Sequence, residues 1–419
     1  MRWKRFWPKL SNSLSEPDFR LNLMSVSALT SLSYTMKNVG KIIIINIAIT
    51  LLFILSLNFL SEGVLLIYGL AEQQMIMVDE RANLPNYADD RETAKLHFQE
   101  FNQLLTQFEA FVGWSRKPFH GETININTKG DRIHQNEATG GAISPNVTSV
   151  DFFGGSTMWG TGVVDTETIP ALFNKISKIP TFNRAETNFT SRQSLERLIN
   201  LLTFEAETIN SVVFYDGVND ILNLCRSENK VGEHGYTDYI RKLLESEGNK
   251  SPANNFWKYI DFTFLRGTKN LIKLVMGEII THSVKTDEYW DQTMNCDNQP
   301  QKTQQIASSL IENWEIAHVI AQAKGIKFLG ILQPVAFMEN SQVAHDLHLN
   351  LGWNNELRKQ YQTVYPLIKS MMRERGYDFL LDYTDLLNRN QNIYIDFCHL
   401  SKNGNMIIAE QLYTDFMRK

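Results

Sequence analysis

The chain has 419 residues, with a hydrophobic fraction of 43%, a charged fraction of 21% and a formal net charge of −5. These values are ordinary for a globular protein, and the length allows one large domain or two smaller ones. The acidic balance and the lack of a dominant basic stripe argue against a nucleic-acid-binding protein. None of the three cysteines has zinc-site spacing, so we expect neither a metal site nor a cofactor.

An uncharged apolar stretch at residues 42–61 follows a basic segment at residues 1–41. In a helix, about 20 such residues cover the hydrocarbon core of a membrane. Because basic residues favour the cytoplasmic side, we predict a signal anchor with residues 1–41 in the cytoplasm and the remainder periplasmic or extracellular. Cleavage near Gly69-Leu70-Ala71 is the alternative, although both the basic segment and the apolar run are long for a signal peptide.

Residues 62–147 are expected to form a juxtamembrane region of two parts. A charged segment at 80–111 carries apolar residues at helical spacing, from Leu96 to Phe108, which predicts a helical stalk. In the segment 113–130, apolar residues alternate with polar ones and glycine and proline interrupt the pattern. This predicts a short hairpin or edge strands beside the main sheet.

In residues 148–419, strand-like runs alternate with helical ones, most clearly the helices expected at 191–208 and 302–323. Such alternation predicts an α/β fold with a parallel sheet, right-handed crossovers and helices on both faces. The polar and aromatic interval 223–300 interrupts the rhythm, and we interpret it as an insertion over the functional site. The expected strands cover 150–153, 181–183, 212–215, 326–332 and 379–381.

Ser156 follows Gly154 and Gly155 directly after the first of these strands. Glycine allows a sharp turn of the backbone, and ligands bind parallel sheets at the carboxyl ends of the strands. The serine is therefore placed as an enzyme would place a nucleophile. Taken alone, such a triplet is more often only a tight turn.

Other polar residues follow other predicted strands. Asn219 and Asp220 come shortly after the strand 212–215, and Asp396 precedes His399 by three residues near the carboxyl terminus. Serine, histidine and aspartate can together carry out acyl transfer, in which serine attacks, histidine takes its proton and aspartate orients the imidazole. Amide groups can stabilise the oxyanion that forms in such a reaction.

These blocks resemble those of the SGNH, or GDSL-type, hydrolases, and the resemblance covers about residues 148 to 416. The first block corresponds to Gly154-Gly155-Ser156 and the second to Asn183…Asn188-Phe189-Thr190-Ser191. The third block, Gly-x-Asn-Asp, is matched fully by Gly217 to Asp220. The fifth block, Asp-x-x-His, is matched fully by Asp396 to His399.

The resemblance implies a flavodoxin-like three-layer sandwich. It also implies that Ser156 is the nucleophile, His399 the base and Asp396 the carboxylate that orients the base. The oxyanion hole would combine the backbone N–H groups of Ser156 and Asn188 with the side-chain amide of Asn219.

The sequence departs from the family pattern at two positions near this site. Gly155 replaces the family's common aspartate, and Asn188 replaces a glycine in the second block. Asparagine keeps the N–H and tolerates left-handed geometry, so the oxyanion hole can persist. If the backbone is instead reoriented, one donor is lost. Gly217 and Gln333 are candidates for substrate contact, with a turn role as the alternative for Gln333.

Cys225 and Cys296 lie in or beside the insertion and form a disulfide if the domain is exported. Closing a loop of about 70 residues contributes on the order of 4 kcal/mol to stability in the chain-entropy account. Cys398, which lies between Asp396 and His399, is expected to be a packed free thiol.

We therefore expect a membrane-anchored ester hydrolase that removes acyl groups, most simply acetyl groups, from an extracytoplasmic glycan or a related ester. One alternative is an O-acyltransferase that modifies a surface polysaccharide through the same acyl-serine intermediate, and this reading needs a multi-span partner to supply the acyl group. A non-catalytic glycan-binding module is a further alternative, for which Asn188 is the only indication.

Overall fold

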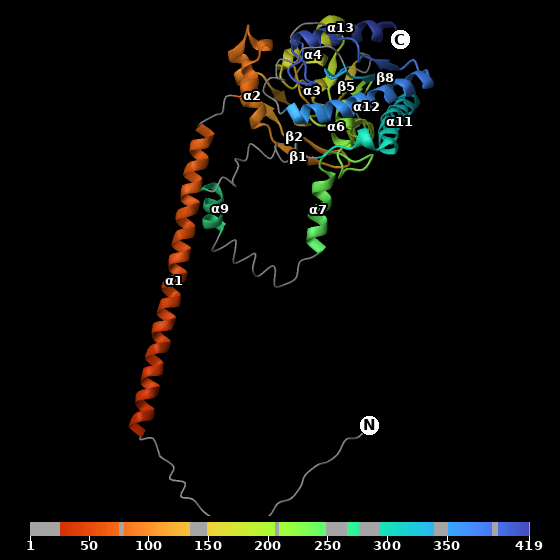
Figure 1. The fold of residues 1–419 in the computed structure, drawn as a ribbon. Helices are drawn as coiled ribbons and strands as arrows, with labels where there is room; N and C mark the ends of the chain where they lie inside the picture. Colours follow the sequence, from red (N-terminus) through yellow and green to blue (C-terminus); the bar gives the residue numbers. More distant parts are fainter. Residues whose placement is uncertain are drawn as a thin grey trace, which may run out of the picture. The chain divides into compact units, whose positions relative to one another are not determined.

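The computed structural model describes residues 26–74, 79–134, 149–205, 209–248, 266–275, 293–338, 351–387 and 393–418. The chain divides into two compact units (Figure 1). One unit comprises Met1–Ala71 and Pro252–Ile279, and the other comprises Glu72–Ser251 and Ile280–Lys419.

The first unit contains α9 (Arg266–Val275) and nearly all of α1 (Val26–Gln74). Within α1, the interval Met36–Ile67 is long and apolar enough to cross a membrane, and it includes the predicted span 42–61. Most of its large apolar side chains are exposed. A helix in a soluble core would bury them, whereas a helix surrounded by lipid exposes them.

The second unit is built on a five-stranded parallel sheet. Numbered along the chain, its strands lie in the order 2-1-3-4-5, which is the order of flavodoxin-like doubly wound sheets. The predicted α/β fold is confirmed, and each expected strand agrees with the observed one to within about a residue at most ends. In spatial order the strands are β6 (Thr181–Asn183), β5 (Val150–Gly154), β7 (Ser211–Asp216), β8 (Lys327–Leu332) and β9 (Leu380–Asp382).

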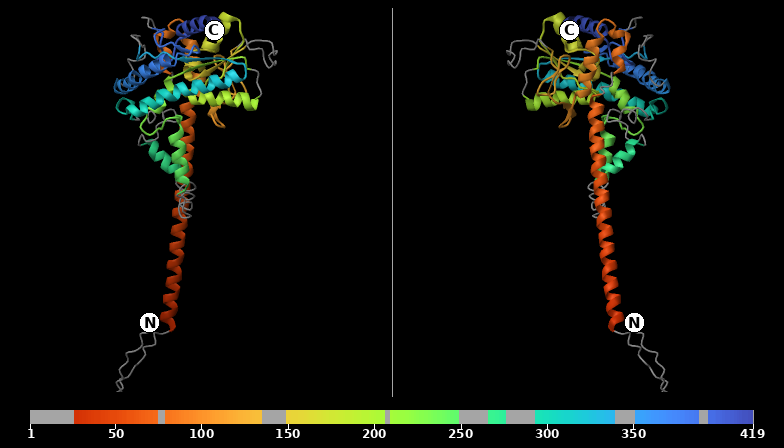
Figure 2. Two further views of the ribbon diagram at one scale, coloured as in Figure 1. Left: turned by 90° about the vertical axis from the view of Figure 1, so that its right-hand side faces the viewer. Right: turned by 90° about the vertical axis from the view of Figure 1, so that its left-hand side faces the viewer.

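Helices cover both faces of this sheet, as Figures 1 and 2 show for α11 (Pro300–Ala323) and α13 (Lys402–Arg418). The central strand β7 explains why, because Val212 and Phe214 pack into one apolar cluster and Val213 and Tyr215 into the other. Side chains alternate along a strand, so a strand of apolar residues needs a helical layer on each side. The other helices of these layers are α3 (Ser156–Trp159), α4 (Ile169–Ser177), α5 (Ser191–Asn200), α6 (Val218–Leu224) and α12 (Leu351–Arg375).

Two helix predictions have different outcomes. The helix expected at 302–323 is confirmed by α11. The helix expected at 191–208 is shorter, because α5 ends at Asn200 and is followed by a π-helical segment, Leu201–Glu205. Residues 206–208 lie outside the described part of the chain.

Residues 79–134 belong to the same compact unit as the sheet. The helical prediction for 80–111 is wrong except at α2 (Arg91–Gln103). Short 3-10 turns precede α2 at Glu80–Asn83 and Pro85–Tyr87, where Pro85 lacks the N–H that a continuous helix needs. After α2 the apolar residues follow no buried helical face, since Phe108 is 82% exposed and lies in a strand.

The predicted hairpin and edge strands in this region are confirmed. One antiparallel pair joins β1 (Thr106–Glu109) to β2 (Gly113–Arg116), and a second joins β3 (Phe119–His120) to β4 (Asn125–Ile126). A single bridge between Arg132 and Asn183 then connects the region to the edge strand β6. We call residues 79–134 the accessory region.

Buried ion pairs hold the accessory region against the sheet. Asp131 accepts hydrogen bonds from Arg184 at 2.6 Å and from Arg197 at 2.7 Å, and Arg184 also donates to Asp151 of β5 at 2.8 Å. All four side chains are less than 5% exposed. Because each charge has a partner of opposite sign, the cost of removing it from water is offset within the network.

The insertion begins after α6. Cys225 and Cys296 form a disulfide that joins the two ends of the insertion, which we call its base. An antiparallel bridge between Arg226 and Met294 lies next to the disulfide. The helix α7 (Thr237–Gly248) lies in the second unit, whereas α9 lies in the first. Much of the expected insertion, at 249–265 and 276–292, lies outside the described residues.

Candidate active site

Ser156 is the first residue of α3 and follows strand β5 after the turn at Gly154 and Gly155. Gly154 has φ 150°, and a Cβ there would lie 2.4 Å from the carbonyl oxygen of Tyr215, so only glycine fits. The serine side chain is half-buried at the carboxyl end of the sheet. The N–H groups of this first helical turn have no acceptor within the helix, and they are available to an anion.

His399 and Asp396 lie in the loop before α13 and form a continuous hydrogen-bonded series with Ser156. The Nε2 atom of His399 is 2.7 Å from the Oγ of Ser156, and its Nδ1 atom is 2.6 Å from the Oδ2 of Asp396. With Nδ1 donating to the carboxylate, Nε2 accepts the serine proton. The three side chains predicted from the sequence as a triad therefore lie in hydrogen-bond contact.

The carboxylate of Asp396 is held by its own loop. Its Oδ1 accepts the N–H of Cys398 at 3.0 Å and the N–H of His399 at 2.8 Å. Burial alone raises the pKa of this carboxyl, but His399 and the two backbone N–H groups outweigh burial and hold the pKa well below its ordinary value. Asp396 is therefore ionised at neutral pH and keeps His399 in one orientation.

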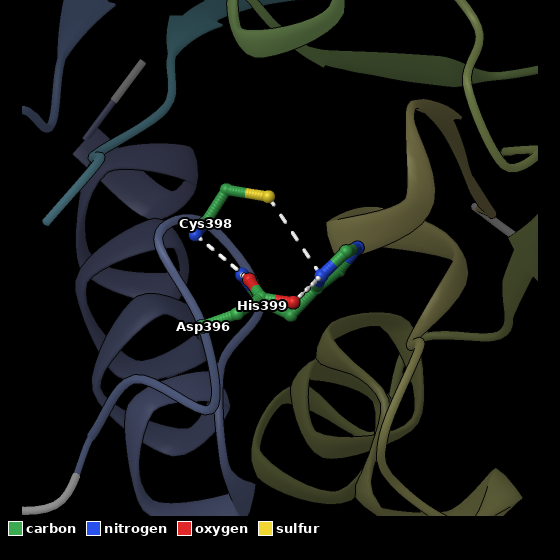
Figure 3. Close-up of side chains that lie close together, drawn as sticks. All are labelled: Asp396, Cys398 and His399. Carbon is green, nitrogen blue, oxygen red and sulfur yellow. Dashed lines mark hydrogen bonds and ion pairs between the residues drawn. The ribbon is translucent and has the colours of Figure 1, made fainter. Parts of the chain in front are cut away.

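Cys398 lies beside this pair, with its sulfur 3.7 Å from Nδ1 of His399 (Figure 3). Its thiol is buried, and burial together with nearby Asp396 raises the thiol pKa well above its ordinary value. Nucleophilic attack and metal binding both use the thiolate, so this thiol is poorly suited to either role. The oxygens of Asp396 are already engaged by its own loop, which fits a hydrogen-bonding role better than a cation site.

Asn219 supplies an amide group close to the turn that carries Ser156. It lies in the first turn of α6, and its Nδ2 donates to the carbonyl oxygen of Phe189 at 2.8 Å. An amide nitrogen carries two hydrogens, so one remains for a second acceptor. A Cβ built on Gly155 would lie only 2.2 Å from this nitrogen, which places the Asn219 amide directly beside the peptide that carries Ser156.

Asn188 has a left-handed backbone, with φ 65°, where the resembled family has glycine. Its side-chain oxygen accepts a hydrogen bond from Asn223 at 3.0 Å. A Cβ built on Gly235 of the insertion would meet the Asn188 amide nitrogen at 2.6 Å. The side chain of Asn188 is therefore packed between α6 and the insertion, while its backbone keeps the conformation that the sequence analysis expected.

Asp216 and Asp220 form a buried acid pair behind these donors, a feature that the sequence analysis missed. Asp220 accepts the hydroxyl of Ser191 at 2.5 Å and the backbone N–H of Ser191, which ties the start of α6 to the start of α5. Burial and the neighbouring Asp220 raise the pKa of Asp216 to about 7. The signal in the sequence was two carboxylates within an apolar segment.

Asp216 has two further partners within this buried pair. Ser194 and the indole N–H of Trp314 donate to its two oxygens, each at 3.0 Å. Two ionised carboxylates that are buried away from water repel each other strongly, so the pair retains a proton near neutral pH. The pair thus connects β7, α5, α6 and α11 behind the donor groups.

Gln333 and Gly217, the two candidates for substrate contact, lie on different elements beside the site. Gln333 is only 2% exposed and donates to the hydroxyl of Thr157 at 3.2 Å, while Thr157 donates to the carbonyl oxygen of Cys398 at 3.1 Å. Gln333 thus connects the end of β8 to the serine turn and the histidine loop. Gly217 has φ 120° and precedes α6, so it sets the direction of the helix that carries Asn219.

Arg132 of the accessory region reaches the same turn, and no motif in the sequence indicated it. Its guanidinium donates to the carbonyl oxygen of Gly160 at 2.7 Å and to Asp165 at 2.8 Å. It lies over the ring of Trp159 at 4.4 Å. These contacts hold the carboxyl end of α3, so the accessory region positions the short helix that begins with Ser156.

No protein-family model matches the chain, and no curated protein is similar to it. Several solved structures are similar to the chain at low identity. A lipolytic protein of the G-D-S-L family from Veillonella parvula is 12% identical over 65% of this chain and 100% of its own length, with a TM-score of 0.34. A GDSL-like lipase from Bacteroides thetaiotaomicron is 14% identical, covers 66% of this chain and 92% of its own, and has a TM-score of 0.35.

A lipase/acylhydrolase from Enterococcus faecalis is 11% identical over 64% of this chain and 96% of its own, with a TM-score of 0.31. The shared part spans about two thirds of this chain in each case. By this comparison, the chain is similar to lipases and lipolytic proteins of the G-D-S-L type.

Proposed function

We propose that this chain is a membrane-anchored serine ester hydrolase of the SGNH type. The observation that carries the proposal is the continuous series Ser156–His399–Asp396, with its hydrogen-bond distances of 2.7 Å and 2.6 Å. The series lies at the carboxyl end of a doubly wound parallel sheet, where such folds bind their ligands. The block order along the chain supports the same assignment.

In the proposed reaction, His399 Nε2 removes the hydroxyl proton of Ser156 as its Oγ attacks the acyl carbon of the ester. The protonated His399 then gives this proton to the leaving alcohol, and an acyl-serine remains. Water, deprotonated by His399, then attacks the acyl-serine, the acyl–Oγ bond breaks to release the carboxylic acid, and His399 returns the proton to Oγ of Ser156. Asp396 stays ionised throughout and stabilises the imidazolium.

The developing oxyanion needs donors that are already oriented before the reaction. We assign this role to the backbone N–H groups of Ser156 and Asn188 and to the second amide hydrogen of Asn219. The left-handed backbone of Asn188 and the position of the Asn219 amide beside Gly155 support this assignment. Gly217 and Gln333 act on the site through the elements that they hold, which accords with the burial of Gln333.

The substrate that we propose is an acylated, most simply acetylated, glycan or related ester outside the cytoplasm. The apolar helix and its basic amino-terminal flank support a domain that is tethered to a membrane on the exported side. A disulfide between Cys225 and Cys296 accords with an oxidising compartment.

A serine-directed fluorophosphonate probe provides the test of the chemistry. The full chain in detergent is expected to be labelled at Ser156 and to release acid from a panel of simple esters and acetylated glycans. A folded Ser156→Ala variant serves as the control. If the Ser156→Ala variant were labelled as strongly as the wild type, the proposal would be contradicted. If the ester were consumed faster after an acceptor sugar is added, transfer would be favoured over hydrolysis.

Protease accessibility provides the test of topology. Protease added to intact spheroplasts is expected to digest the second unit and spare residues 1–41. Protection of the second unit until the membrane is permeabilised would reverse the proposed orientation.

A further inference from the structure

The insertion sends a helix, α9, back to α1, and the two helices are in close contact. The side-chain oxygen of Asn58 on α1 accepts the backbone N–H of Gly267 at 2.7 Å and that of Thr268 at 3.3 Å. Asn58 thus supplies acceptors for N–H groups that the first turn of α9 cannot satisfy itself. The amino end of α9 is fixed to one point along α1.

Gly267 makes this close approach possible. A Cβ at this position would lie 2.5 Å from the carbonyl oxygen of Asn58 and 2.7 Å from Cγ of Glu62. The carbonyl oxygen of Asn58 cannot move aside, because it belongs to the backbone of a regular helix. Small residues at helix contacts allow the backbones to approach closely in the same way within membranes.

One face of α1 is covered where α9 lies. Asn58 is 5% exposed and Ser61 is 1% exposed, whereas most large apolar residues of this helix are exposed. Ile54 and Leu65, which flank these two at helical spacing, are half-buried. The covered face is therefore a stripe along the last part of the candidate span, Met36–Ile67.

The sequence of α9 is amphipathic. Basic residues recur at positions 266, 269 and 273, and aliphatic residues at 271, 272, 274 and 275, each set at helical spacing. Ile272 is 53% exposed within this unit. A short helix with basic and aliphatic faces is typical of segments that lie in the interface of a bilayer.

We propose that α9 lies in the bilayer interface at the carboxyl end of the span and that lipid contacts its exposed face. Asn58 and Ser61 are at the end of the predicted span 42–61, where hydrocarbon gives way to headgroups. Aliphatic residues of α9 would enter the acyl boundary, and its basic residues would lie among lipid phosphates. This inference rests on the membrane anchoring proposed above.

The connectivity gives this placement a consequence for the active-site region. The insertion leaves the second unit, passes through α9 in the first unit, and returns to the disulfide-closed base at Cys225–Cys296. The chain would then be attached to the bilayer through the spanning helix and again through the insertion. The segment beside Asn188, which includes Gly235, belongs to that same insertion.

Depth-dependent quenching on the full chain in phosphatidylethanolamine–phosphatidylglycerol vesicles tests the inference. Ile272→Cys carries an environment-sensitive fluorophore; the native Cys398 is buried and the other two cysteines are paired. We expect strong quenching by a spin label near the lipid headgroup and several-fold weaker quenching by aqueous iodide than for the same dye on Val319→Cys of α11, where Val319 is 61% exposed.

Two glycine variants supply the matched control. Gly267→Ala places a methyl group against α1, whereas Gly63→Ala on α1 meets nothing within 4 Å. In the labelled protein, Gly267→Ala is expected to increase iodide quenching at position 272 several-fold, and Gly63→Ala is expected to leave it unchanged. Equal effects of the two variants would overturn the inference.

Flotation separates this inference from the anchoring on which it rests. If the chain does not float with vesicles, the anchor itself is wrong. If it floats but the dye at position 272 is fully open to iodide and unaffected by the spin-labelled lipid, α9 is not in the interface. That second outcome would indicate that the aliphatic face of α9 binds another protein instead of lipid.

Discussion

The candidate active site has two halves that are built in different ways. The proton-transfer half, Ser156, His399 and Asp396, uses a short loop motif and one turn, and its side chains bond mainly to one another. The donor half, Asn188 and Asn219, comes from separate segments. Its side chains also bond outside the site, Asn219 to the carbonyl oxygen of Phe189 and Asn188 to the side-chain amide of Asn223. Both departures from the resembled family, Gly155 and Asn188, lie on or beside the donor half.

The contacts of the donor half restrict the residues that fit at position 155. The amide of Asn219 occupies the space that any side chain at position 155 would need, since a Cβ there would lie 2.2 Å from Nδ2. The same amide is held by Phe189 at 2.8 Å and is not free to move aside. The amide to which we assign oxyanion stabilisation therefore also restricts the residues allowed beside it.

The largest effect is expected from removing the nucleophile of the proton-transfer half. Ser156→Ala leaves only the electrostatic and binding contributions, so kcat should fall by about 10⁴ or more. The measurement is turnover of a small ester by protein shown to be folded by circular dichroism. Wild-type turnover by the folded variant would show that this half has no catalytic role.

A smaller loss is expected on the donor half from Asn219→Ala. Losing one preorganised oxyanion donor typically reduces the rate by about 10²–10³. The loss should appear in kcat/KM for one small ester and mostly in kcat, because the donor acts on the developing charge. A change confined to KM would instead indicate a substrate-binding role for Asn219.

Gly155→Ala tests whether the position of the Asn219 amide matters as much as its presence. The added methyl group must displace Nδ2, so kcat/KM is expected to fall by at least about tenfold, or about 1.4 kcal/mol of barrier. Combining Gly155→Ala with Asn219→Ala should cause no further loss beyond Asn219→Ala alone, because the displaced group is already gone. Fully additive losses would show that Gly155 acts through something other than Asn219.

Asn188→Gly should have a smaller effect, because the proposed role of this residue uses a backbone N–H in a left-handed conformation that glycine adopts readily. Activity is expected to stay within about tenfold of the wild type, with a stability cost of about 0.5–1 kcal/mol. If this variant were as damaged as Asn219→Ala, the Asn188 side chain would have a chemical role, and the transferase alternative would gain support.

The acid pair behind the donor half predicts a pH dependence of stability. The pKa of Asp216 is raised to about 7, so between roughly pH 4 and 7 the folded protein keeps a proton that the unfolded chain releases. Its contribution is complete below pH 4 and is lost as the pH rises to 7, by up to about 1.4 kcal/mol per pH unit. Asp216→Asn should flatten this slope, as followed by denaturant unfolding at pH 5, 6 and 7. Parallel slopes for the two proteins would contradict the prediction.

Local sequence patterns were enough to predict much of the second unit. Alternating strand and helix signals predicted the parallel sheet, and apolar residues on both sides of β7 required two helical layers. The Asp396-x-x-His399 spacing predicted that the aspartate orients the histidine, since two residues three positions apart in one loop can hydrogen-bond to each other. The stalk prediction failed after α2 because the spacing of Leu105 and Phe108 did not distinguish an exposed strand from a helical face.

The sequence by itself determined the positions of the strands, the apolar span and the residues of the proton-transfer half, because each depends on neighbours within a short stretch. Only the tertiary structure placed Arg132 under the serine helix, joined Asp220 to Ser191, and brought Asn58 to Gly267. These contacts connect residues that are distant along the chain. Their geometry depends on how whole elements pack, and a single sequence carries no periodic pattern for such pairs.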